Sequence, residues 1–249
     1  MIRKIAISLV LLVTLSGCLG AMQRAAAPLP SETQMELQNA GLTLGAPIYV
    51  RVFKREAQME VWMAGPKGDY QLFRTYDVCN WSGDLGPKLK EGDKQAPEGY
   101  YTITPRQMNP NSKYYLSFNV GYPNAYDRAH GRTGNALMVH GGCLSAGCYA
   151  ITDGSVQELY ILAREAFAAG QNSFQFHAYP FRLTAQNLAA YKDNKWYGFW
   201  QNLKQGYDLF EKTRVPPGVD VNGGRYVFMQ GRGGAPKVYE TAAVPENPT

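Results

Sequence analysis

The stretch "MVHGGCLSAGCYAITDG", Met138 to Gly154, holds one of the three histidines and two of the four cysteines of the chain. Residues of these types placed so close together could form a zinc site, a disulfide, or a nucleophile with its base. Zinc requires four ligands, and this stretch offers His140, Cys143 and Cys148 without a convincing fourth. We therefore expect no metal here.

A disulfide between Cys143 and Cys148 would close a small ring and gain little chain entropy. A nucleophile explains more of the residues, because a cysteine attacks as its thiolate, next to a base, and the attacked carbonyl needs N–H donors for its oxyanion. We expect Cys148 as the nucleophile and His140 as the base. Gly147 allows a sharp turn that would aim backbone N–H groups at the oxyanion, and Ser145 could hydrogen-bond within that turn.

The pattern "VHGGCLSAGC", with His-Gly followed by Ser-x-Gly-Cys, resembles the active-site signature of the L,D-transpeptidase (YkuD-type) catalytic domain. The stretches "GDLGPKLKEGD", "APEGYYTITP" and "YYLSFNVGYPNAYD" resemble the YafK-like branch of that family in particular. The likeness covers about residues 45–185. The step from His140 to Cys148 is short for the family but usual for this branch, and Ala146 stands where many members carry a second histidine.

The resemblance implies an α+β fold, with a β-rich, mixed-sheet catalytic domain, and a cysteine acyl-transfer enzyme that acts on peptidoglycan stem peptides. It implies that Cys148 attacks the carbonyl of the third stem residue, that His140 moves the proton, and that the N–H groups of Gly147 and Cys148 hold the oxyanion. The acyl group then passes to an amine, which makes a crosslink, or to water. The YafK-like branch favours water, in an amidase that releases wall-bound lipoprotein or a stem residue.

No cofactor is expected for this chemistry. Two other classes stay open: a non-catalytic peptidoglycan-binding envelope lipoprotein, and a structural lipoprotein that links envelope layers by protein contact.

Four side chains near the nucleophile are candidates for substrate contact: Arg132, Tyr122, Tyr149 and Ser145. Arg132 is the best candidate, because a guanidinium fork matches a stem-peptide carboxylate. The alternative for its segment, "GYPNAYDRAHGRTG", is a loop held by its own side chains. Tyr149 could line the pocket or pack beneath it.

The other cysteines and histidines have competing interpretations. Cys143 also follows a glycine, so it is a rival nucleophile, a buried thiol, or the disulfide partner of Cys79. His130 is a second candidate base. His177 lies within "FQFHAYPF" and is expected to be a packed strand residue.

Two further residues lie in "APEGYY", which resembles a family motif leading into a strand of the catalytic sheet. Glu98 and Tyr100 are therefore expected to be structural. The Glu98 carboxylate could also support His140 from behind.

The catalytic domain is expected over residues 47–184. Alternation of apolar and polar residues in "PIYVRVFKREAQMEVWMAG" and "DYQLFRTYDVC" predicts two or three half-buried strands around a Gly65–Gly68 turn. A loop is expected over Ser82–Gly99, and further strands at "YYTITP", "KYYLSFNVG" and "SFQFHAYPF". The spacing in "SVQELYILAREAFAAG" predicts a helix capped by Ser155 and ending before Gly170.

A helical extension with a frayed end is expected over residues 185–249. Its aromatic and apolar residues recur at helical spacing: Trp196, Phe199, Trp200, Leu203, Tyr207 and Phe210. Such a stripe is typical of a helix packed on the body. The later segment "RYVFMQG" could form a strand, and residues 232–249 are expected to be frayed.

The chain opens with two basic residues and a short apolar run that reaches "LSGC". This pattern resembles a lipoprotein signal peptide over residues 1–17, with cleavage before Cys18 and a lipid on its thiol. Residues 18–46 are expected to be a tether with at most one short helix near 31–40. The expected location is the periplasmic side of the envelope, anchored by lipid at Cys18, with Leu19 favouring the outer membrane of a Gram-negative bacterium.

The formal net charge is +5 at pH 7, and removal of the signal peptide would lower it by the two charges of Arg3 and Lys4. So small an excess does not favour nucleic acid as a partner. The expected partners are peptidoglycan, wall-linked lipoprotein and a membrane reached through the lipid.

Overall fold

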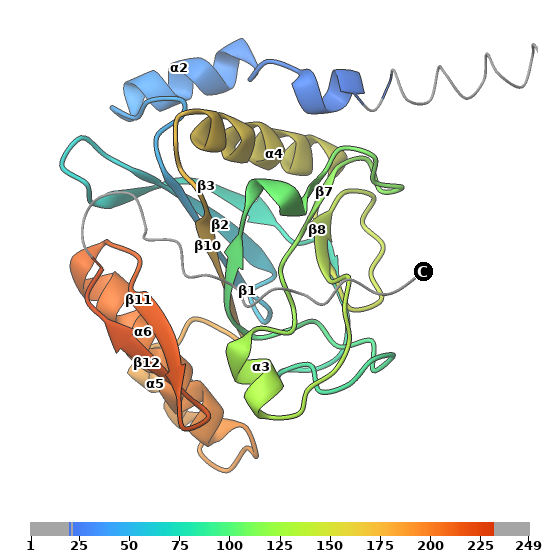
Figure 1. The fold of residues 1–249 in the computed structure, drawn as a ribbon. Helices are drawn as coiled ribbons and strands as arrows, with labels where there is room; N and C mark the ends of the chain where they lie inside the picture. Colours follow the sequence, from blue (N-terminus) through green and yellow to red (C-terminus); the bar gives the residue numbers. More distant parts are fainter. Residues whose placement is uncertain (1–19, 21, 232–249) are drawn as a thin grey trace, which may run out of the picture.

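The structure is a computed structural model that describes residues 20 and 22–231, and its main core is built from two five-stranded sheets and helix α4 (Figure 1). The predicted signal peptide, Cys18 and the predicted frayed end lie outside these residues. Within them, no helix is long and apolar enough to cross a membrane. The fold is α+β with mixed sheets, as expected.

The first sheet contains the strands predicted on both sides of the Gly65–Gly68 turn. In spatial order its strands are β3 (Tyr70–Asp77), β2 (Gln58–Ala64), β1 (Ile48–Phe53), β10 (Phe174–Tyr179) and β5 (Gly99–Ile103). Only β1 and β10 run parallel; the other neighbours are antiparallel. Pro180 follows β10 directly, and because a proline has no N–H to donate to a neighbouring strand, it suits the end of a strand.

The second sheet carries the residues of the conspicuous stretch. Its strands are, in spatial order, β4 (Asn80–Trp81), β9 (Tyr149–Ala150), β8 (Met138–His140), β7 (Ser117–Asn119) and β6 (Met108–Asn109). Strands β8 and β9 are parallel. Of the strand predicted at "KYYLSFNVG", only the three residues of β7 form a strand. A single turn of 3-10 helix, Pro105–Gln107, precedes β6.

Helix α4 (Asp153–Ala168) confirms the predicted amphipathic helix and packs against β1, β7 and β8. Its N-cap is Thr152 and not Ser155, because the Thr152 side chain accepts a hydrogen bond from the Ser155 N–H. The helix thus begins one turn earlier than predicted. Gly170 follows its end with φ +104°, a conformation that a glycine adopts without strain.

Strand β1 is buried on both faces, whereas alternation predicts burial on one. Ile48, Val50 and Val52 belong to the main core. The opposite face is covered by helix α6 (Tyr197–Thr213), and Arg51 on that face pairs with Glu211 of α6 at 2.6 Å. The alternation predicts that Arg51 faces solvent, but helix α6, which is distant in the sequence, encloses it.

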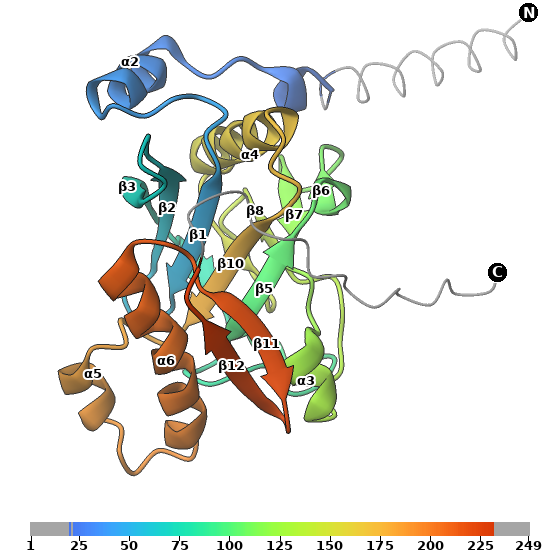
Figure 2. The same ribbon diagram turned by 60° about the vertical axis from the view of Figure 1, so that its left-hand side comes forward.

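The C-terminal extension contains the predicted helix and a hairpin, in which β12 (Arg225–Met229) confirms the strand suggested by "RYVFMQG" and β11 (Gly218–Asn222) was not predicted. Its elements are α5 (Ala185–Ala189), α6, β11 and β12. Figure 2 shows the hairpin beside α6, on the side of the first sheet away from α4. Four residues of the predicted stripe are buried, as expected, in a second core cluster with Phe53 and Tyr179: Phe199, Trp200, Leu203 and Tyr207. Phe210 is buried in a third cluster with Tyr49, and Trp196 is half-buried.

The expected tether is corrected over residues 29–42. Leu29, Leu37 and Leu42 are buried in the main core. Helix α2 (Ser31–Asn39), the short helix predicted here, lies alongside α4 (Figure 1), and Thr33 Oγ1 donates to Glu158 of α4 at 3.0 Å. This part of the segment packs against the body because its leucines complete the core.

Candidate active site

The β8–β9 pair brings His140 and Cys148 to neighbouring strands. His140 is the last residue of β8, and Cys148 immediately precedes β9. In the parallel register Val139 lies opposite Tyr149, and both are fully buried. Side chains alternate along a strand, so His140 and Cys148 belong to the face of the pair opposite to the core. The loop that joins the strands therefore sets the relative position of the two groups.

The ring of His140 has a defined tautomer. Its Nδ1 lies 2.6 Å from the carbonyl oxygen of Gly141, and a carbonyl can only accept, so Nδ1 carries the proton. The lone pair is then on Nε2, which has no hydrogen-bond partner among residues 20 and 22–231. Tyr114 stacks on the ring with centroids 4.7 Å apart. A neutral imidazole held this way can act as a base through Nε2.

Cys148 is half-buried and is the only cysteine of the described chain outside a disulfide. Burial raises the pKa of its thiol, while a hydrogen bond from the Met138 N–H and the positive charge of Lys88 act in the opposite direction. The Met138 nitrogen lies 3.4 Å from the Cys148 sulfur. Because burial dominates, the thiol is mainly protonated at neutral pH, and attack requires a base.

Cys79 and Cys143 form a disulfide across 64 positions of the chain. This confirms one of the alternatives for Cys143 and removes its thiol as a rival nucleophile. Cys79 directly precedes β4, which pairs with β9, and Asn80 Nδ2 also donates to the Cys143 carbonyl at 3.4 Å. The disulfide thus ties the loop between His140 and Cys148 to the edge of the sheet that carries both residues.

The loop turns at two places that need glycine. At Gly141, a Cβ would lie 2.4 Å from Asp153 Oδ1 and 2.9 Å from the Tyr114 carbonyl oxygen. Gly147 has φ +124°, a backbone conformation that residues other than glycine rarely adopt. The Gly142 N–H donates to Asp153 Oδ1 at 2.9 Å, so the start of α4 holds the first turn.

Ser145 hydrogen-bonds within the second turn, as one expectation had it. Its Oγ donates to the Cys148 carbonyl at 2.7 Å and accepts from the Gly147 N–H at 3.3 Å. The predicted oxyanion donor at Gly147 is therefore occupied by Ser145 in this structure. The main-chain N–H of Cys148 has no hydrogen-bond partner among the residues described and is the better donor.

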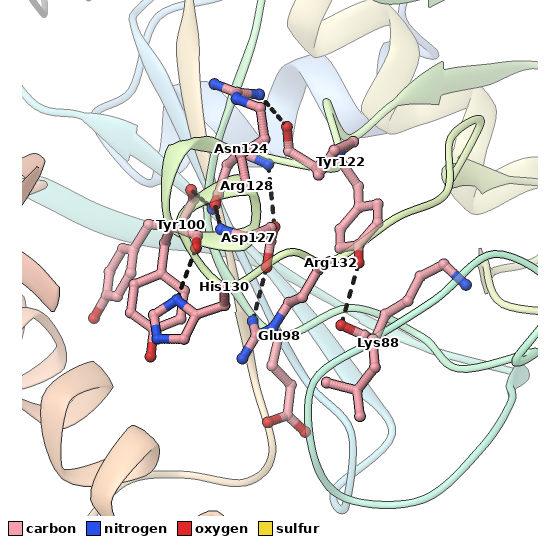
Figure 3. Close-up of polar contacts among 12 residues, drawn as sticks. Lys88, Glu98, Tyr100, Tyr122, Asn124, Asp127, Arg128, His130 and Arg132 are labelled. Atoms are coloured by element: carbon pink, nitrogen blue, oxygen red, sulfur yellow. Dashed lines mark hydrogen bonds and ion pairs between the residues drawn. The ribbon is translucent and has the colours of Figure 1, made fainter. Parts of the chain in front are cut away.

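Arg132 is buried and forms an ion pair with Asp127, so it stabilises its own segment in this structure. Its Nη1 lies 2.8 Å from Asp127 Oδ1 (Figure 3). Its guanidinium lies 5.1 Å from the ring centres of both Tyr126 and Phe199. Only 4% of its side chain is exposed. Burial raises the pKa of Asp127 although Arg132 acts against this. The segment is held by its own side chains and contains helix α3 (Ala125–Ala129).

The two candidate tyrosines are also enclosed. Tyr122 is buried, and its hydroxyl donates to the Lys88 carbonyl at 3.2 Å (Figure 3). Tyr149 is fully buried, and its hydroxyl donates to the Pro97 carbonyl at 2.6 Å. Of the two alternatives for Tyr149, the structure shows packing beneath the site. Both hydroxyls therefore donate to backbone carbonyls of the chain itself.

The other histidines lie apart from Cys148. His130 follows α3, stacks on Tyr126 with centroids 4.2 Å apart and donates from Nδ1 to the Tyr126 carbonyl at 2.9 Å. His177 is fully buried, with Nδ1 2.7 Å from the Tyr49 hydroxyl. Burial holds the pKa of His177 well below its ordinary value. The prediction of a packed strand histidine is confirmed.

Glu98 and Tyr100 connect the catalytic domain to its extension. The Glu98 carboxylate accepts from the Gly86 N–H at 2.7 Å and from Trp200 Nε1 at 2.8 Å, and lies 3.1 Å from Lys54 Nζ. Tyr100 donates to the Leu203 carbonyl at 2.5 Å. The prediction that both residues are structural is confirmed. Both oxygens of the Glu98 carboxylate have partners other than His140.

Sequence reasoning missed two residues near the site, Tyr114 and Lys88. Lys88 is buried and donates to the Lys90 carbonyl at 2.8 Å and to Asp93. Nothing local in either segment signals proximity to His140 or Cys148, since both arrive from separate loops. No group of three or more potential metal ligands occurs in the described residues.

Comparison with known sequences gives two relatives. The chain is 42% identical over 232 residues to the protein named "Putative L,D-transpeptidase YafK" of Escherichia coli (strain K12), with 92% of this chain and 91% of that protein covered. The protein of the same name from Escherichia coli O157:H7 matches to the same extent. No family model matches the chain.

Solved structures show a more distant likeness. The helical cell shape determining protein Pgp2 from Campylobacter jejuni has a TM-score of 0.44 and 19% identity, with 71% of this chain and 67% of that chain covered. Bd1075 from Bdellovibrio bacteriovorus has a TM-score of 0.39 and 15% identity, with 72% and 78% covered. The identity and coverage of the two sequence relatives show that this protein belongs to the YafK-like branch of the L,D-transpeptidases.

Proposed function

We propose that this protein is a cysteine acyl-transfer enzyme that acts on the stem peptides of peptidoglycan. One observation carries the proposal: the single free thiol of the described chain immediately precedes β9, the strand beside β8, and β8 ends in a histidine whose Nε2 has no hydrogen-bond partner in the described residues. Family membership supplies the class of substrate.

The first half of the reaction forms a thioester. The Cys148 sulfur attacks the carbonyl carbon of the third stem residue while His140 Nε2 takes the thiol proton. The main-chain N–H of Cys148 donates to the oxyanion. The carbon–nitrogen bond then breaks, and the imidazolium returns its proton to the departing amine. The protein needs no metal or cofactor for these steps.

The second half resolves the thioester. Water attacks the acyl carbon and gives up a proton to His140. The carbon–sulfur bond then breaks, the acid is released, and the imidazolium returns its proton to the Cys148 thiolate. We propose water as the acceptor, on the basis of resemblance to the YafK-like branch, so that the protein would release wall-bound lipoprotein or a stem residue. An amine from another stem peptide in place of water would give a crosslink. We further propose that the protein is exported and lipidated at Cys18.

The test uses purified sacculi with bound lipoprotein, incubated with the protein and its variants and analysed by mass spectrometry. Wild type should release stem-linked material, Cys148→Ala should release none, and His140→Ala should be slower by about 10²- to 10⁴-fold. His130→Ala is the matched control, because this exposed histidine lies outside the site. New crosslinked dimers would indicate transpeptidation, and identical profiles from wild type and Cys148→Ala would leave the two non-catalytic classes, a peptidoglycan-binding or a structural lipoprotein.

A further inference from the structure

We infer that Tyr114 is a positioning residue for the base, His140. The inference rests on the proposed function, in which His140 moves the proton of Cys148. It starts from the stacked contact of the two rings, whose centroids are 4.7 Å apart with planes inclined by 28°.

The backbone around Tyr114 is built to hold it at the base. Its carbonyl accepts the Gly141 N–H at 3.0 Å, and its N–H donates to Ser112 Oγ at 3.1 Å. The next residue, Tyr115, has φ +70°, a left-handed conformation that a tyrosine adopts only under constraint. Tyr115 packs partly against the core and donates to Gln157 at 2.8 Å. The turn at Tyr115 therefore directs one tyrosine inward and the other onto His140.

Exposure argues against a purely structural role for the Tyr114 side chain. It is 46% exposed, so it contributes less to the core than a buried aromatic. Its hydroxyl has no hydrogen-bond partner in the part of the chain that the structure describes. What the side chain does contact is the imidazole of His140 and the Gly142 backbone, where a Cβ would lie 3.2 Å from Tyr114 Cδ1.

The stacked ring can act on His140 in two ways. It blocks rotation of the imidazole out of the plane in which Nδ1 reaches the Gly141 carbonyl, so Nε2 keeps its direction. When the imidazole takes the thiol proton it becomes a cation, and an aromatic face within about 6 Å attracts a cation. Both effects need the aromatic ring and neither needs the hydroxyl.

The experiment measures turnover of soluble muropeptides by the full chain in detergent. Tyr114→Leu should lower kcat by between about 10- and 100-fold, because a small misplacement of a catalytic group has effects of that size, while KM stays near that of wild type. Tyr114→Phe, which keeps the aromatic ring, should have a kcat close to that of wild type. Leu72→Ala is the matched control, because Leu72 is also 46% exposed but lies on β3.

A second readout isolates His140 from any general effect on folding. The chain has three histidines, so ¹⁵N-histidine labelling gives three sets of ring signals, and the pattern of His140 reports its tautomer. Wild type and Tyr114→Phe should show the Nδ1–H form, and Tyr114→Leu should show averaging between forms. Unchanged ring signals and unchanged kcat in Tyr114→Leu would overturn the inference, as would a higher KM with unchanged kcat.

The outcome separates this inference from the proposed function. If His140→Ala keeps full activity, the proposed function itself fails. If His140→Ala is inactive and Tyr114→Leu is as active as wild type, the proposed function stands and the role of Tyr114 is rejected.

Discussion

The indole nitrogen of Trp200 donates a hydrogen bond of 2.8 Å to the carboxylate of Glu98. Trp200 lies on α6 and Glu98 immediately precedes β5, so this bond joins the C-terminal extension to the sheet of the catalytic domain. The other carboxylate oxygen lies 3.1 Å from Lys54, and both side chains of that ion pair are fully buried.

Glu98→Ala should destabilise the protein by about 3–5 kcal/mol, because it leaves the buried charge of Lys54 without its partner. Trp200→Phe removes only one hydrogen bond to a charged group and some packing, so its effect should be smaller. Urea unfolding followed by circular dichroism measures both. Glu91→Ala, in the exposed part of the preceding loop, is the control. A loss below about 1 kcal/mol for Glu98→Ala would contradict the importance of this pair.

Lys88→Met should raise the pKa of Cys148 further, because the lysine charge stabilises the thiolate. At a fixed pH below that pKa less thiolate is present, so the rate of alkylation should fall and its midpoint should move to higher pH. The rate is measured with iodoacetamide across neutral and alkaline pH, with mass spectrometry of the peptide that contains Cys148. Lys90→Met, an exposed lysine of the same loop, should leave the profile unchanged. Equal profiles for the two variants would exclude an electrostatic effect of Lys88.

Replacing both Cys79 and Cys143 by serine should lower the free energy of unfolding by about 2–4 kcal/mol, since the disulfide closes a long loop in the unfolded chain. Turnover should fall as well, because the loop from His140 to Cys148 loses its attachment beside β4. Unfolding and sacculus digestion are compared with wild type. An unchanged rate would show that the turn contacts of Ser145 and Asp153 are sufficient to hold the loop.

Leu37→Ala should destabilise the protein by about 2–4 kcal/mol, because Leu37 is buried where α2 meets the core. Met35→Ala on the same helix should change stability by less than about 0.5 kcal/mol, since that side chain is 56% exposed. Thermal and urea unfolding of the pair measure the difference. Similar values for both would mean that α2 does not dock in solution.

Local patterns were sufficient to predict the strands of the first sheet and helix α4, but not the short strands β4, β6, β8 and β9 of the second sheet. Period-two alternation predicts β1 and β2, and three-and-four spacing predicts α4, because each pattern reports one buried face. The burial of Arg51 could not be predicted this way. It depends on Glu211, which lies 160 positions further along the chain.

The same distinction holds for the site. His140 and Cys148 were predictable because they flank one short loop and match a known signature. Arg132 was predicted to bind a stem-peptide carboxylate because a guanidinium fork matches that group, but Asp127, five positions earlier, already pairs with its guanidinium. Tyr114 and Lys88 reach the site from other loops, so only the folded chain shows them.

The packing of the segment that contains α2 against the body limits the distance between the catalytic domain and a membrane that holds the N-terminus. If Cys18 carries a lipid, the chain between Cys18 and Ala25, which packs partly against the main core, spans at most about 25 Å when fully extended. The catalytic domain would then act only on the layer of the wall closest to its own membrane, and lengthening this segment would widen the zone in which its substrates are accessible.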